Sequence, residues 1–76
     1  MIVDRGEGTG YRFQLFQPGV GLVAGGRLIP VVILDRERYD DGQENYYVSF
    51  EDAKAGLLLS WILAEDLMEI DSNKKG

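Results

Sequence analysis

The chain has neither cysteine nor histidine among its 76 residues. Disulfide bridges, thiolate nucleophiles, imidazole bases and the common zinc sites are therefore excluded. Without histidine, the few serine and threonine hydroxyls cannot be activated as acyl-transfer nucleophiles. We expect no catalytic residue, no metal site and no cofactor, and the sequence favours a role other than catalysis.

Positive charge is also scarce. Eight Lys and Arg residues face thirteen Asp and Glu residues, which gives a net charge of −5. This sign opposes contact with a phosphate backbone and argues against nucleic acid as a partner. No apolar run is long enough to span a bilayer, and no basic segment followed by an apolar one opens the chain. We therefore expect no membrane partner and a cytoplasmic location.

What remains is the composition of one small folded domain. Hydrophobic residues make up 45% of the sequence, which is normal for a globular protein. Glycines spaced among charges predict a flexible arm over residues 1–10. We place the domain at residues 11–71 and a disordered tail at residues 72–76.

The pattern within the domain predicts strands. Apolar and polar residues alternate in an extra N-terminal strand, Tyr11–Phe16, and β-branched and aliphatic residues dominate several later segments. The predicted further strands are Val20–Ala24, Leu28–Leu34, Tyr46–Phe50, Leu57–Leu63 and Leu67–Ile70. The charged residues 35–45, with their Asp41-Gly42 turn signal, predict a solvated hairpin tip. With one helical turn at residues 64–66, the expected fold is all-β.

A helix over residues 52–70 is the alternative, and it would make the fold α+β. Ser49-Phe50-Glu51-Asp52 has the form of a capping box, and the segment is rich in Ala, Leu and Glu. Against this helix, Gly56 lies in its interior and its apolar residues would cover the whole circumference.

In this order the segments resemble the small SH3-like barrels of the Tudor and chromo-barrel type. The resemblance lies in four runs: Phe16-x-Pro18-Gly19, Val31-x-Ile33, Tyr47-Val48-x-Phe50 and Trp61-Ile62-x-x-Glu65-Asp66-Leu67. It implies a bent five-stranded barrel that binds a peptide, a modified lysine or a partner domain. For a methyl-lysine cage it implies Trp61 with Tyr47 and Phe50, but the second-strand position of the cage is Ile29, which has no π-face.

The chain is also similar, more weakly, to the plasmid-type (type II) dihydrofolate reductases, whose small barrels form a symmetric tetramer. The matching stretch is Leu58-Leu59-Ser60-Trp61. Leu59 replaces the glutamine that binds pterin and nicotinamide in that family. The resemblance therefore implies assembly through this strand, without the enzymatic activity.

The sequence has more apolar strand residues than one core face requires. Alternation assigns to the core face Ile29, Val31, Ile33, Tyr46, Val48, Phe50 and Ile62. The opposite face then carries Leu28, Val32, Leu34, Tyr47, Leu59 and Trp61, where a solvent-facing strand is normally polar. These six residues, with Ser60 beside them, are the candidate binding surface, because an exposed apolar patch marks an interaction site.

Cover for this face could come from the Tyr11–Phe16 strand, from a second copy or from a ligand. Our leading hypothesis is an interaction or assembly module that self-associates, most simply as a dimer, or docks on a protein or peptide partner. The alternative is a small-molecule site, with or without enzymatic activity, formed between symmetric copies of the barrel.

Overall fold

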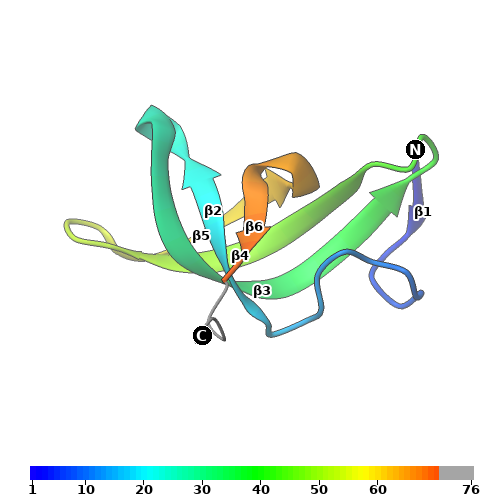
Figure 1. Cartoon of the computed structure of the whole chain (residues 1–76), viewed down its shortest axis with the longest axis horizontal. Helices are drawn as coiled ribbons and strands as arrows, with labels where there is room; N and C mark the ends of the chain where they lie inside the picture. The colour runs from blue at the N-terminus through cyan, green and yellow to red at the C-terminus, as the bar shows by residue number, and fades with distance from the viewer. Residues whose placement is uncertain (71–76) are drawn as a thin grey trace, which may run out of the picture.

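The structure is a computed structural model that describes residues 1–70. It contains six strands and two single turns of 3-10 helix: β1 (Ile2–Asp4), β2 (Pro18–Val23), η1 (Ala24–Gly26), β3 (Arg27–Tyr39), β4 (Glu44–Asp52), β5 (Gly56–Leu63), η2 (Ala64–Asp66) and β6 (Leu67–Glu69). The strands form one antiparallel sheet in the order β5-β4-β3-β2-β6, and β1 pairs with the far end of β3 (Figure 1). The all-β prediction is confirmed. The alternative helix over residues 52–70 is wrong, because β5, η2 and β6 occupy that segment.

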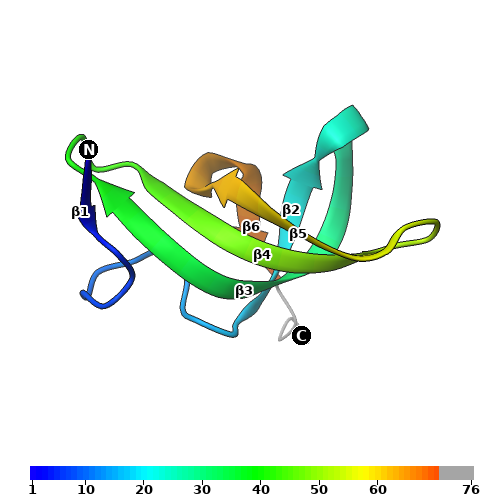
Figure 2. The ribbon, with the colours of Figure 1, turned by 180° about the vertical axis from the view of Figure 1, so that it is seen from behind.

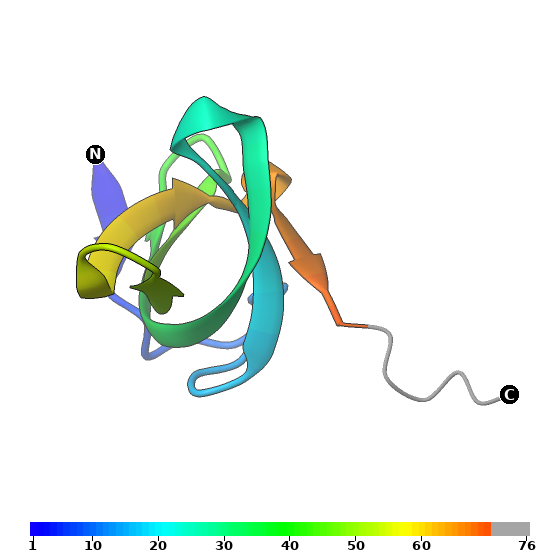
Figure 3. The ribbon, with the colours of Figure 1, turned by 90° about the vertical axis from the view of Figure 1, so that its left-hand side faces the viewer.

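The long strand β3 belongs to both arms of the sheet. Its first half, from Arg27 to Val32, pairs with β2, and its second half, from Val32 to Arg38, pairs with β4. The β2–β3 and β4–β5 hairpins therefore point in different directions (Figure 1), and the sheet curls around its inner face (Figure 3). This small antiparallel sheet is compatible with a β-barrel-like fold.

The core lies on the inner face of the curled sheet. Its buried residues are Tyr11, Phe13, Val31, Ile33, Tyr46, Val48, Ile62, Ala64 and Leu67, with Ile29 and Phe50 partly buried against them. All seven residues that alternation assigns to the core face are in this cluster or packed against it. The core face of the sheet was thus predicted correctly.

The expected strand Tyr11–Phe16 is wrong, because this segment is not a strand. Two of its backbone amides bond to side chains of β4: the amide of Arg12 donates to Glu44 Oε1, and that of Phe13 to Tyr46 Oη. Phe16 has a φ of 65°, a left-handed conformation that ends an extended run. Because Tyr11 and Phe13 point into the core, they give no cover to the outer face.

The solvated hairpin tip expected over residues 35–45 is much shorter than predicted. Strand β3 continues to Tyr39 and β4 begins at Glu44, so that residues 40–43 alone connect them. A β-bulge interrupts this hairpin at Ile33/Asp35: Ile33 lies opposite Val48 and Asp35 opposite Tyr47, so that Leu34 is the extra residue. The bulge shifts the alternation by one residue and brings Arg36 and Arg38 to the inner side.

The arm expected at residues 1–10 contains strand β1, which pairs with β3 at Ile2↔Tyr39 and Asp4↔Arg38. Asp4 Oδ1 then accepts hydrogen bonds from the backbone amides of Gly6, Glu7 and Gly8. This part of the segment is therefore held in place by hydrogen bonds. The expected tail at residues 72–76 lies outside the described residues. Over residues 1–70, no helix is long and apolar enough to cross a membrane.

Candidate functional site

The outer face of the sheet carries a row of small and apolar residues across four strands. The register places Pro18 opposite Val32, Val32 opposite Ser49, and Ser49 opposite Leu59. Directly opposite residues share a face, and the neighbours Ile33 and Val48 are buried on the other side. The row therefore lies on the outside, where Val32 and Leu59 are 39% and 50% exposed.

A pair of aromatic rings continues this surface along β4 and β5. Tyr47 lies opposite Trp61, with the ring centroids 5.0 Å apart and the planes tilted by 41°. Trp61 is the only tryptophan of the chain, and it remains 44% exposed. At the other end of β5, Leu57 lies opposite Glu51 and is 64% exposed. We call Val32, Tyr47, Leu57, Leu59 and Trp61 the outer patch.

A shallow apolar groove adjoins the outer patch. Its volume is about 410 Å³, and its lining includes Pro18, Pro30, Val32, Phe50, Leu57 and Ile70. Both prolines lie where β2 and β3 pair, and Ile70 follows β6 directly. The groove thus extends the patch toward the β2–β6 side of the sheet. Figure 2 shows β3, β4 and β5 side by side.

The candidate residues read from the sequence separate into two groups. Four of them, Val32, Tyr47, Leu59 and Trp61, come together in the outer patch. The structure places the other three elsewhere: Leu28 opposite Leu22 on the β2–β3 arm, Leu34 at the bulge, and Ser60 opposite buried Val48 on the inner face. Sequence reasoning missed Leu57, although its alternation with Leu59 and Trp61 was a signal for it.

The aromatic residues of the possible methyl-lysine cage do not share one face. Phe50 lies opposite Leu58, two residues from buried Val48, on the inner side. Tyr47 and Trp61 lie on the outer side. A cage needs rings that surround one cation, and this arrangement separates them.

A polar cluster stands at the other end of the inner face, where the bulge directs Arg36 and Arg38. The guanidinium carbons of both arginines lie over the Tyr11 ring, 4.3 and 4.2 Å from its centroid. Arg36 also donates to the backbone oxygens of Gly6, Phe13 and, at 3.5 Å, Gly8. The cluster fixes the N-terminal segment to β3.

Glu44 completes this cluster from β4. Its carboxylate accepts hydrogen bonds from the Arg12 amide at 3.1 Å and from the Tyr46 hydroxyl, and it lies 3.7 Å from Arg38 Nε. Burial raises the pKa of Tyr46, and the bond to Glu44 raises it further. The Glu44 carboxylate and the Tyr46 hydroxyl thus link β4 to the N-terminal segment and serve a structural role.

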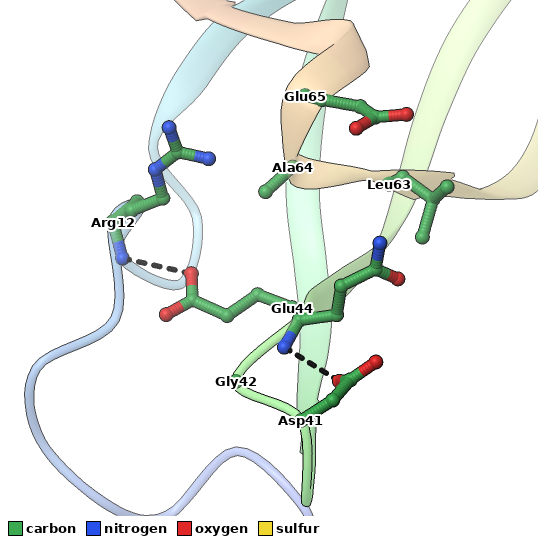
Figure 4. Close-up of a pocket in the computed structure, with 8 residues that line it drawn as sticks. Arg12, Asp41, Gly42, Glu44, Leu63, Ala64 and Glu65 are labelled. Atoms are coloured by element: carbon green, nitrogen blue, oxygen red, sulfur yellow. Dashed lines mark hydrogen bonds between the residues drawn. The ribbon is translucent and has the colours of Figure 1, made fainter.

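A second hollow, of about 310 Å³, lies beside Glu44 (Figure 4). Its lining includes Arg12, Asp41, Leu63, Ala64 and Glu65. The Glu44 carboxylate is engaged by the Arg12 amide, as Figure 4 shows. Within residues 1–70, no three acidic side chains are grouped so that they could hold a metal ion. The outer patch is therefore the stronger candidate site.

Comparison of the chain with known protein families, curated proteins and solved structures found no match.

Proposed function

We propose that the protein is a small assembly module that self-associates through the outer patch. The observation that carries this proposal is the exposure of Leu57, Leu59 and Trp61 on one strand, with exposed Val32 two strands away across Ser49. Isolated apolar residues on a surface are normal, but a contiguous patch marks an interaction site. Each half-exposed side chain that a partner covers gains on the order of 1 kcal/mol.

A second copy of the chain is the partner that fits this patch best. The patch itself contains no charged residue, although the whole chain carries −5. Acidic residues lie at its border, Asp35 opposite Tyr47 and Glu51 opposite Leu57, so two copies can bring the five patch residues together without a charge between them. An identical partner is always present, and a two-fold contact repeats the same residues on both sides.

The fold proposed for this module is an SH3-like barrel. The strand order β5-β4-β3-β2-β6, the long β3 shared by two arms and the single helical turn before β6 support this proposal. In this proposal β2–β6 correspond to the bent five-stranded arrangement that the sequence resemblance implies, and β1 is an addition.

A pair of matched variants tests the proposed self-association. Leu59→Lys places a charge within the patch, whereas Leu28→Lys places one on an equally exposed leucine near the tip of the β2–β3 hairpin. Light scattering after gel filtration should find dimers for the unmodified protein and Leu28→Lys, and monomers for Leu59→Lys. Circular dichroism should show the same strand content in all three. Equal masses for all three proteins would overturn the proposal.

A further inference from the structure

We infer that two copies join edge to edge, with β5 of one copy pairing antiparallel with β5 of the other about a two-fold axis at Ser60. This inference rests on the proposed self-association and specifies its contact. The β5 residues of the outer patch, Leu59 and Trp61 above all, meet across the two-fold axis, and the two outer patches join into one surface on the same side of a continuous sheet.

Strand β5 is an unprotected sheet edge. Among residues 1–70 it pairs with β4 alone, through eight consecutive residue pairs without a bulge. It contains no proline and no charged residue. Natural proteins protect long edges with charges, proline, bulges or covering segments, because free backbone amides and carbonyls recruit another strand. An edge without these protections is suited to pairing.

The other terminal strand of the sheet offers a poorer partner. Strand β6 has three residues against the eight of β5, and it ends in a charged residue, Glu69. A β5–β6 contact between copies would therefore leave most of the β5 edge unpaired. The β5 strand of a second copy has the same length as this edge and likewise carries no charged residue.

The side chains select the register of this pairing. A two-fold axis perpendicular to the sheet pairs residues that share a face. Centred on Ser60, it sets Leu59 opposite the partner's Trp61, and Leu58 opposite the partner's Ile62. Ser60 then lies opposite Ser60 of the partner subunit. Centred on Leu59 instead, it would set the Ser60 hydroxyl against the partner's Leu58.

Charges at the two ends of β5 are complementary in this register. Lys54 lies in the turn before β5, and Glu65 and Asp66 lie in η2 directly after it. Within the described residues, none of the three forms an ion pair inside the chain. Antiparallel pairing brings Lys54 beside the partner's Glu65 and the partner's Asp66, once at each end of the contact. These pairs oppose the repulsion between two chains of net charge −5.

Single cysteines test the geometry in this cysteine-free chain. Opposite residues of an antiparallel pair have Cα atoms about 4.5–5.5 Å apart, within the range of a disulfide. Under mild oxidation, Ser60→Cys should therefore form covalent dimers. Leu58→Cys should not, because it lies four residues, or about 13 Å, from its own copy. Ser49→Cys, on the outer face of β4, reports on face-to-face stacking instead.

The outcomes separate this inference from the proposal on which it rests. Dimers in solution with a cross-link at Ser49→Cys, or with no cross-link at Ser60→Cys, would overturn the edge contact but keep the self-association. A monomer in solution, without any cross-link, would overturn both.

Charge reversal provides an independent check of the register. Lys54→Glu alone, or Glu65→Lys with Asp66→Lys, should weaken self-association about tenfold, because both ends of the contact become repulsive. Mixing these two variants should restore the affinity, since each heterodimer end then pairs opposite charges. Failure of the mixture to recover would overturn the register.

Discussion

Arg36 shows how one residue can join two parts of this chain. Its guanidinium group bonds to three backbone oxygens of the N-terminal segment and lies over the Tyr11 ring. Only a planar group with several donors can make all these contacts, which the single ammonium of lysine cannot.

Arg36→Lys should therefore lower the free energy of unfolding by about 2 kcal/mol. The matched control is Arg27→Lys, since Arg27 forms one exposed ion pair with Asp52 at 3.7 Å. That change should stay within about 0.5 kcal/mol. Urea denaturation measures both variants. Equal losses would show that Arg36 does not hold the N-terminal segment.

Tyr46 gives the protein a dependence on alkaline pH. Burial raises the pKa of this tyrosine above its ordinary value of 10.0, and so does the hydrogen bond to Glu44. Burial also raises the pKa of Tyr11. Above pH 10 the unfolded chain loses these protons before the native chain does. The stabilisation is therefore complete below pH 10 and is lost as pH rises beyond it.

The urea concentration at the midpoint of denaturation should accordingly decrease as the pH is raised from about 9.5 to 11.5. This range is set around the ordinary tyrosine pKa of about 10. Tyr46→Phe should make this decrease of the midpoint with pH smaller. Part of the decrease should remain, because the pKa of Tyr11 is also raised. The variant should also be less stable at pH 7 by about 1–3 kcal/mol, because Glu44 and the Phe13 amide lose a partner. An unchanged slope in Tyr46→Phe would contradict this account.

The roles of these residues were not predictable from the sequence. Strict alternation after Ile33 would direct Arg36 and Arg38 away from the core, and the charge of residues 35–45 with the Asp41-Gly42 turn signal predicted a solvated tip. One extra residue at the Ile33/Asp35 bulge reverses that assignment. A bulge of this kind depends on the partner strand, and local sequence carries little signal for it.

Among the elements, β2 depends on a glycine for its packing. A Cβ at Gly21 would lie 3.0 Å from Ile62 Cδ1 and 3.3 Å from Val31 Cγ1. These distances are shorter than ordinary contacts, so the absent side chain allows β2 to approach β5 and β3 on the inner face.

Gly21→Ala should destabilise the fold by about 1–3 kcal/mol through overpacking. Ile62→Val removes the nearest atom, so that adding it to Gly21→Ala should recover part of this loss. Thermal denaturation of the two single variants and the double variant measures the coupling. Additive losses would mean that Gly21 and Ile62 do not compete for the same space.

Element order was largely predictable, because it depends on local patterns. β-Branched and aliphatic runs placed β3 and β5, and the interior Gly56 argued against a C-terminal helix. The prediction of a strand at Tyr11–Phe16 was wrong for a reason that lies outside the segment. Tyr11 and Phe13 pack into the core instead of covering the outer face, and the amides of Arg12 and Phe13 bond to Glu44 and Tyr46, more than thirty residues away. For the candidate site, alternation grouped Val32, Tyr47, Leu59 and Trp61. The same alternation directs Ser60, between Leu59 and Trp61, to the inner face, where it lies opposite Val48.

At the scale of the whole molecule, the single tryptophan reports on assembly. Trp61 is 44% exposed in one copy, and the proposed contact covers part of that surface with Leu59 of the partner subunit. Dilution from high to low micromolar concentration should therefore shift its emission to longer wavelength as dimers dissociate. Leu59→Lys should show the long-wavelength emission at every concentration. A constant spectrum in the unmodified protein would contradict assembly at this strand.

Sedimentation equilibrium of the unmodified protein tests the central claim, self-association through the outer patch, most directly. The chain has a mass of 8.5 kDa. The account predicts an average mass that rises toward twice this value at high micromolar concentration and falls back to it on dilution. A mass that stays at 8.5 kDa throughout that range would contradict it.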